Sequence, residues 1–287
     1  MTGADTQYNL PRTDLEGTYP DLGKWVAYDD GEEDKPYDYS CFKCHTTGPE
    51  DLGDPNANPG LPGFGGDRFA EAGIQCEACH GPGSSHAASR NPDHVTVDTT
   101  AELCGRCHTR DSQGRIAASG GLVKHHEQYD ELRGINPDDV AAGPTGAHYN
   151  AGITCVTCHD PHKTTRYQDV ASTGRAIRIE CIGCHDGYDD LTVDAMEGEV
   201  ECEDCHMPRL AKSAVKSDPE GPAPAFGDIR SHIVKVDLSA ADQFTSDGKF
   251  AYPWITRSFA CLACHNDAEE PAADATGFTG KMHVSTP

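Results

Sequence analysis

The arrangement of cysteines constrains this chain more than any other feature of its sequence. All 14 cysteines fall into pairs, and each pair belongs to the pentapeptide Cys-x-x-Cys-His. The seven motifs are Cys41, Cys44 and His45; Cys76, Cys79 and His80; Cys104, Cys107 and His108; Cys155, Cys158 and His159; Cys181, Cys184 and His185; Cys202, Cys205 and His206; and Cys261, Cys264 and His265. Because no cysteine lies outside them, one repeated chemistry accounts for every thiol.

This pentapeptide is the attachment signature of c-type haem. Two thiols three positions apart share one face of a helical turn, where both can bond to the vinyl groups of a single porphyrin. The next residue is a histidine, whose imidazole can serve as the proximal ligand of the iron. Disulfides would not require a histidine after every second cysteine, and zinc sites do not repeat one at this fixed offset. The motifs therefore predict seven covalently bound haems c.

Composition indicates that side chains alone do not fill the interior. Only 36% of the 287 residues are hydrophobic, and the chain contains 30 Gly and 19 Pro. Seven haems in 287 residues leave about 41 residues for each, too few to isolate every porphyrin in its own core. We therefore expect mostly irregular coil with short α-helices and little β structure, wrapped around a continuous stack of haems.

The charge and hydropathy of the chain exclude some partners. With 23 Lys and Arg against 47 Asp and Glu, the formal charge is −24, which repels nucleic acid and anionic membranes. Such acidity is typical of high solubility, or alternatively of adaptation to high salt. No run of 18 apolar residues predicts a membrane span. Because haem attachment occurs outside the cytoplasm, we expect an exported chain whose signal peptide has been removed.

Motif spacing divides the chain into two predicted parts. Residues 1–40 contain neither cysteine nor histidine and form a haem-free N-terminal arm, whereas residues 41–287 form the heptahaem domain. Helical patterns occur only near the motifs and at residues 123–133, while residues 51–66 and 217–227 are rich in loop-forming residues. The long intervals 109–154 and 207–260 are expected to wrap around haems and to supply further ligands.

The remaining histidines suffice to give every iron a second imidazole. Eight lie outside the motifs, namely His86, His94, His125, His126, His148, His162, His232 and His283. Seven distal positions need filling, so we predict bis-histidine ligation throughout, with His94 as the spare. A methionine ligand is the alternative, and Met282 is its best candidate because it neighbours His283. In an extended segment, the vicinal His125 and His126 would point to opposite sides and serve two haems.

The flanks of several motifs resemble those of multihaem cytochromes c. The similar segments are C-E-A-C-H-G-P-G-S-S-H at 76–86, H-H-E-Q-Y at 125–129, His148, C-V-T-C-H-D-P-H at 155–162, C-E-D-C-H-M-P-R at 202–209 and G-D-I-R-S-H at 227–232. They are similar to the lineage of pentahaem nitrite reductases, octahaem oxidoreductases, small tetrahaem carriers and extracellular cytochrome filaments. The resemblance implies that His86, His126, His148, His162 and His232 are distal ligands, each to a haem other than that of its own motif.

The resemblance implies electron transfer, and two classes of function remain open. The first is an electron carrier without catalytic residues, as the subunit of an extracellular or cell-surface filament or as a monomeric shuttle. Its partners would be copies of itself, other redox proteins or extracellular electron acceptors. The second is a periplasmic reductase or oxidase acting on a nitrogen or sulfur oxyanion, for which Arg175 and Arg178 are the candidate cations. Reductases of the lineage often carry Cys-x-x-Cys-Lys, which this chain lacks.

Overall fold

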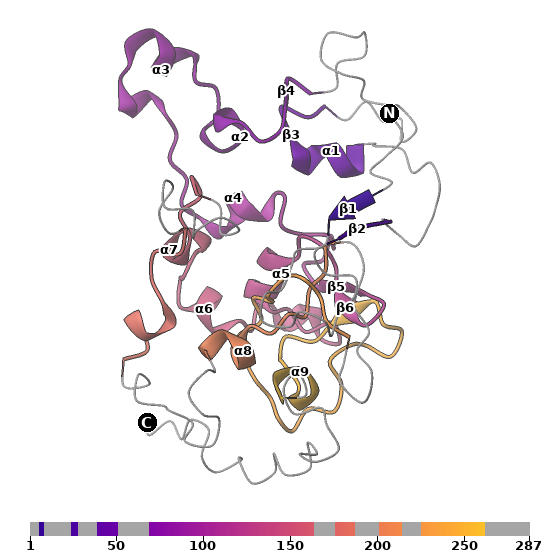
Figure 1. Cartoon of the computed structure of the whole chain (residues 1–287). Helices are drawn as coiled ribbons and strands as arrows, with labels where there is room; N and C mark the ends of the chain where they lie inside the picture. Colours follow the sequence, from indigo (N-terminus) through magenta and orange to yellow (C-terminus); the bar gives the residue numbers. More distant parts are fainter. Residues whose placement is uncertain are drawn as a thin grey trace.

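A computed structural model shows how the motifs are arranged (Figure 1). The structure describes residues 6–8, 24–27, 39–50, 69–163, 176–186, 201–213 and 225–261, and the account below concerns these residues. Cys264, His265 and His283, as well as Met282 and Arg175, lie outside them.

Short helices and coil dominate the described residues, as expected from the composition. The helices are α1 (Tyr39–His45), α2 (Cys76–His80), α3 (Ser84–Ser89), α4 (Ala101–Gly105), α5 (Gln128–Arg133), α6 (Ala147–Asn150), α7 (Cys155–Cys158), α8 (Cys202–His206) and α9 (Arg257–Cys261), with 3-10 turns η2 (Pro92–His94), η3 (Val140–Ala142) and η5 (Cys181–Gly183). The strands are β1 (Thr6–Tyr8), β2 (Trp25–Ala27), β3 (Thr46–Thr47), β4 (Glu71–Ala72), β5 (Ile116–Ser119), β6 (Leu122–Val123) and β7 (Phe250–Ala251). Within these residues, no helix has the length and apolar character needed to cross a bilayer.

A three-stranded antiparallel sheet joins the two long intervals between motifs. Its order is β6-β5-β7, so strands from residues 116–123 pair with a strand near residue 250. The hairpin between β5 and β6 turns at Gly120 and Gly121, whose φ angles of 61° and 79° lie in the left-handed region. Glycine adopts this region without steric cost, and such turns match the twist of hairpin strands.

A small side-chain core packs around this sheet, which the composition did not predict. Ile116, Leu122, Leu210 and Ile255 have no exposed surface, and they cluster with Phe259 of α9. Burial of each large aliphatic side chain contributes about 2 kcal/mol. The two long intervals therefore build a protein core as well as supplying ligands.

The segment 123–133 differs from the continuous helix that its sequence pattern predicts. Val123 belongs to β6 and pairs with Ala118, and the helix begins only at Gln128. A turn at His125 and His126 separates the two, with His126 at φ 62°. The helix ends at Gly134, whose left-handed φ of 62° lets its N–H reach the carbonyl of Asp130.

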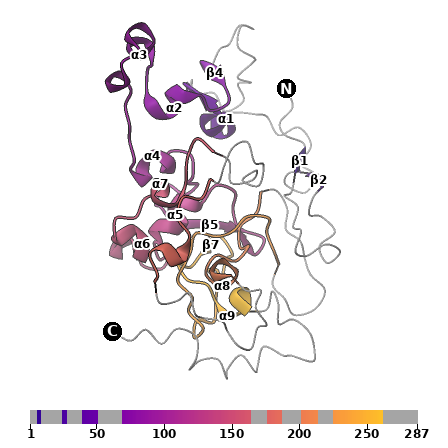
Figure 2. The same cartoon turned by 60° about the vertical axis from the view of Figure 1, so that its left-hand side comes forward.

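The N-terminal elements lie apart from the core (Figures 1 and 2). β1 pairs antiparallel with β2, and β3 pairs with β4 beside α1. In both views α3 lies at the outer edge of the described elements, beyond α2. The predicted division at residue 40 stays a prediction, although residues 6–8 and 24–27 form a hairpin of their own.

Candidate functional site

Each described motif forms a short helical turn that holds its histidine against its first cysteine. The backbone N–H of His108 donates to the carbonyl of Cys104 at 2.9 Å. The equivalent bond from His159 to Cys155 is 2.8 Å, and an N-terminal capping box at Thr154 stabilises that turn. The described motif cysteines are half-buried or exposed, with Cys41 excepted because its side chain is not described. Their sulfurs therefore lie outside the core, where a porphyrin edge can reach them.

Sulfur atoms of different motifs lie side by side. Thiols in hydrogen-bond contact are Cys44 with Cys107, Cys104 with Cys155, and Cys181 with Cys202, while Cys158 and Cys184 are close enough to interact electrostatically. Helix α8 of the sixth motif contacts α9, which carries Cys261 of the seventh. The attachment points thus follow one another from motif to motif along the molecule.

Five motif histidines each face a histidine from another segment. Ring-centroid distances are 6.3 Å for His45–His125, 6.0 Å for His80–His162, 5.2 Å for His108–His126, 6.0 Å for His148–His185 and 6.0 Å for His159–His232. Because imidazole nitrogens bind first-row transition metals at about 2 Å, two rings on one metal ion have centroids about 6 Å apart. The four separations of 6.0 to 6.3 Å fit one iron between the two rings, whereas the 5.2 Å between His108 and His126 is shorter.

Hydrogen bonds orient several motif histidines. The Nδ1 atom of His80 lies 2.7 Å from the carbonyl oxygen of Thr96, and that of His206 lies 2.7 Å from the carbonyl oxygen of Val234. Because a carbonyl oxygen only accepts, Nδ1 carries the proton and Nε2 keeps its lone pair. A second bond of this kind fixes the tautomer of metal-binding histidines in general. These donors therefore fit the haem that the motifs predict.

The vicinal His125 and His126 lie in a turn rather than in the extended segment expected from their sequence. Their ring centroids are 3.5 Å apart, so the two rings do not point to opposite sides. His125 stacks parallel to His45 with an interplanar angle of 4°, whereas His126 lies 5.5 Å from His45 and 5.2 Å from His108. The left-handed backbone at His126 brings both rings to the same side, where both lie near His45 and His126 also faces His108.

Burial keeps this pair of imidazoles neutral. Burial, followed by the Arg110 guanidinium, lowers the pKa of His125 to about 4. Burial and the adjacent His125 lower the pKa of His126 to about 2. Both rings therefore keep a free nitrogen lone pair at neutral pH, which is the form that binds a metal ion.

His86 and His94 lie on the outer α3 and η2 segment. His86 Nδ1 donates to the carbonyl of Asn91 at 2.9 Å, in the same way as the motif histidines. His94 is exposed, and its Nδ1 donates to the Ser89 hydroxyl oxygen at 2.8 Å, since that hydroxyl itself donates to the carbonyl of Ser85. Among the described residues, neither ring lies against a motif histidine. The choice of His94 as the spare stays a prediction.

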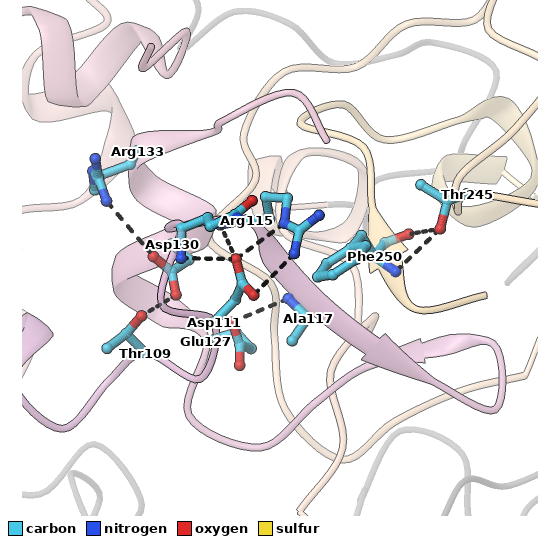
Figure 3. Close-up of polar contacts among 10 residues, drawn as sticks. Thr109, Asp111, Arg115, Ala117, Glu127, Asp130, Arg133, Thr245 and Phe250 are labelled. Atoms are coloured by element: carbon cyan, nitrogen blue, oxygen red, sulfur yellow. Dashed lines mark hydrogen bonds and ion pairs between the residues drawn. The ribbon is translucent and has the colours of Figure 1, made fainter. Parts of the chain in front are cut away.

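Sequence reasoning missed three buried acids in and just before α5, of which Figure 3 labels Glu127 and Asp130. Asp130 accepts a hydrogen bond from Thr109, and Glu127 accepts from the N–H of Ala117 at 3.2 Å. Burial raises the pKa of Glu127 to about 10, so this carboxyl group is neutral at pH 7. Glu131 is also buried, with 2% of its surface exposed. The acidic composition suggested solvated carboxylates, and no local signal distinguishes these three from the others.

Of the two cations considered for an oxyanion site, the structure describes Arg178. Arg178 lies 3.5 Å from Asp160 and donates to the carbonyl of Val156 at 3.5 Å, while Arg175 lies outside the described residues. Arg178 is also half-exposed. The contacts of Arg178 with Asp160 and Val156 are those of a surface ion pair, which contributes little to stability or binding.

Comparison with known families matches two parts of the chain. The family described as doubled CXXCH motif matches residues 69–113 and 148–190. The family described as cytochrome c554 and c-prime matches residues 26–81. Together, the matched segments contain the first five motifs. Part of the interval between the third and the fourth motif is not matched.

Two curated relatives and one solved structure match parts of the chain. The multiheme cytochrome MtrA of Shewanella baltica is 25% identical over 154 residues, covering 50% of this chain and 45% of the relative. The dissimilatory sulfite reductase MccA of Wolinella succinogenes is 24% identical over 205 residues, covering 59% of this chain and 27% of the relative. The chain thus spans less than half the length of these curated relatives. Among solved structures, the outer cell wall cytochrome OcwA is 19% identical, with a TM-score of 0.50 over 90% of this chain and 67% of that one. That likeness concerns the fold.

Proposed function

We propose that this chain, a multihaem c-type cytochrome, transfers electrons through seven covalently bound haems that each have two histidine ligands. One observation carries the proposal: five motif histidines face a second histidine, four of them at the spacing of one shared metal ion. Two imidazoles saturate the axial positions of a haem iron and leave none for a substrate. An iron held in this way can exchange one electron and is otherwise inert.

The protein would hold each haem by two thioether bonds and two axial histidines. The pairs support the assignment of His125, His126, His148, His162 and His232 as distal ligands to the motifs that they face. His86 and His283 would supply the sixth and seventh haems. The chain of adjacent sulfur atoms supports a continuous stack, because attachment points that lie side by side bring the attached groups close together.

The number and ligation of the haems can be tested together. Denatured protein is expected to retain a covalently bound mass of seven haems, and replacement of any motif's two cysteines by alanine should remove one. Electron paramagnetic resonance of the native ferric protein should show only low-spin haem, since two imidazoles give a strong ligand field. A bound mass of six haems or fewer would contradict the count.

A reductase is the second candidate, because the match to the sulfite reductase MccA covers more than half of this chain. Such an enzyme would leave one iron with an open axial position, and a cationic pocket would stabilise the oxyanion. Arg178 is paired with Asp160 instead. A stoichiometric high-spin ferric signal in the same spectrum would favour the enzyme over the carrier.

Within the electron-transfer function, we favour an exported subunit of a cytochrome filament. His86 supports this choice. Its Nδ1 donates to a backbone carbonyl, as in a metal-binding histidine, it belongs to an outer segment, and none of the described motif histidines lies against its ring. A haem at the end of one subunit could take such a ligand from the next. Likeness in fold to an outer cell wall cytochrome is compatible with an extracellular or cell-surface location.

Assembly can be tested on purified protein. Electron microscopy should show filaments, and deletion of residues 266–287 should release soluble subunits with one altered haem, since it removes His283. The variant His86→Ala tests the other candidate ligand. It should release soluble subunits with one altered haem only if His86 is a ligand to a haem of the neighbouring subunit. Sedimentation of the intact protein as a monomer at high concentration would replace the filament with a shuttle.

A further inference from the structure

A buried carboxylate lies behind one of the paired histidines. Glu131 of α5 has no exposed side-chain surface and accepts hydrogen bonds from the Ser231 hydroxyl at 2.9 Å and the N–H of His232 at 3.0 Å. Its Oε2 atom also lies 3.7 Å from Nδ1 of His232. That Nδ1 atom is buried and makes no shorter polar contact. Glu131 is therefore the acidic side chain beside Nδ1 of His232.

Three motif histidines have neutral acceptors at this position. Nδ1 of His80 and of His206 faces a backbone carbonyl, and Nδ1 of His108 lies 2.8 Å from the side-chain oxygen of Gln128. An anionic acceptor differs from these because it strengthens electron donation by the imidazole to its metal ion. A buried negative charge also disfavours the addition of an electron nearby, since low dielectric screens it weakly.

One other described ligand candidate has a carboxylate behind it, under different conditions. His162 Nδ1 lies 3.5 Å from Asp160, but the His162 side chain is 74% exposed. Lys163 and Arg178 also lie within 3.6 Å of Asp160. Solvent and these two cations offset the charge of Asp160, whereas the Glu131 side chain is not exposed to solvent. The remaining α5 acids have other partners, since Asp130 bonds to Thr109 and Glu127 to Ala117.

We infer that Glu131 is a positioning residue that orients His232 and lowers the reduction potential of the haem bound at Cys155, Cys158 and His159. The inference rests on the proposed bis-histidine ligation. A haem of lower reduction potential holds an electron less readily than the neighbouring haems do. The inference therefore gives this haem a specific place in the electron path. It also explains why a helix far along the chain contributes a buried acid to the segment of His232.

The test is a redox titration in which single haems are followed by optical and paramagnetic resonance spectra. Glu131→Gln keeps the shape of the side chain and removes its charge, so the potential of one haem should rise while the others stay unchanged. The affected haem should be the one that becomes high-spin in His232→Ala. The reciprocal variant Gln128→Glu should lower the potential of the haem bound at His108, because it installs a carboxylate behind that ring.

Two controls separate charge from structure. Asp247→Asn removes the same charge from an exposed turn and should leave every potential unchanged. Ser231→Ala removes one hydrogen bond to Glu131 but keeps the carboxylate, and should give a smaller shift than Glu131→Gln. An unchanged potential in Glu131→Gln, with His232→Ala still producing one high-spin haem, would overturn the role of Glu131 alone. If His232→Ala produced no high-spin haem, the ligation itself would be wrong.

Discussion

Replacement of both His125 and His126 by alanine is expected to convert two haems from low spin to high spin, whereas either single replacement converts one. The reason is the proposed pairing of His125 with His45, at 6.3 Å, and of His126 with His108, at 5.2 Å, although His126 also lies 5.5 Å from His45. Loss of an axial imidazole leaves the iron five-coordinate or water-ligated, and the weaker ligand field makes it high-spin. The measurement is the number of high-spin ferric haems per chain by paramagnetic resonance.

Two further variants make this experiment specific. His126 has a left-handed backbone, which costs any residue with a Cβ about 1 kcal/mol but costs glycine nothing, so His126→Gly relieves this strain and should still convert one haem to high spin. His94→Ala is the matched histidine control, because His94 is exposed and bonds to Ser89. A double variant with only one high-spin haem would mean that one of the two histidines is not a ligand. A high-spin signal in His94→Ala would mean that the spare histidine is a different one.

Gly227→Ala is expected to destabilise the fold by about 3 kcal/mol, because two backbone segments meet at this position without room for a methyl group. A Cβ atom on Gly227 would overlap the carbonyl oxygen of Ala211. Ala211 and Ile229 exchange backbone hydrogen bonds of 3.2 and 3.1 Å, and Gly227 donates to Arg209 at 2.9 Å. Separation of the segments would break these bonds and displace His232, five residues further along. We expect a lower denaturation midpoint and partial conversion of one haem to high spin.

A control glycine shows that the effect comes from the close approach. Gly83 has φ −92°, which any residue adopts, and its Cβ would meet only the flexible end of the Glu77 side chain at 3.2 Å. Gly83→Ala should therefore change the midpoint little. If Gly227→Ala were equally mild, the two segments would have to separate without cost, and their bridge would not position His232.

Local sequence patterns predicted those parts of the fold that form within a few residues. The motif helices are an example, because the bond from a motif histidine back to its first cysteine closes within five residues. The segment 123–133 shows where such reasoning fails. Its apolar and acidic pattern suits a helix throughout, but Val123 is taken into β6 by pairing with β5, which in turn pairs with β7 from the far end of the chain. Long-range pairing outweighed local propensity there.

By itself, the sequence determined the cofactor chemistry and the supply of ligands, because a Cys-x-x-Cys-His motif contains both attachment thiols and a proximal histidine within one turn. It also provided eight further histidines without indicating which of them face which motif. Only the tertiary structure brought His125 to His45 and His232 to His159, and only it buried Glu131 behind His232. The physical reason is range: thioether attachment depends on neighbours along the chain, whereas ligand pairing and burial depend on how distant segments pack.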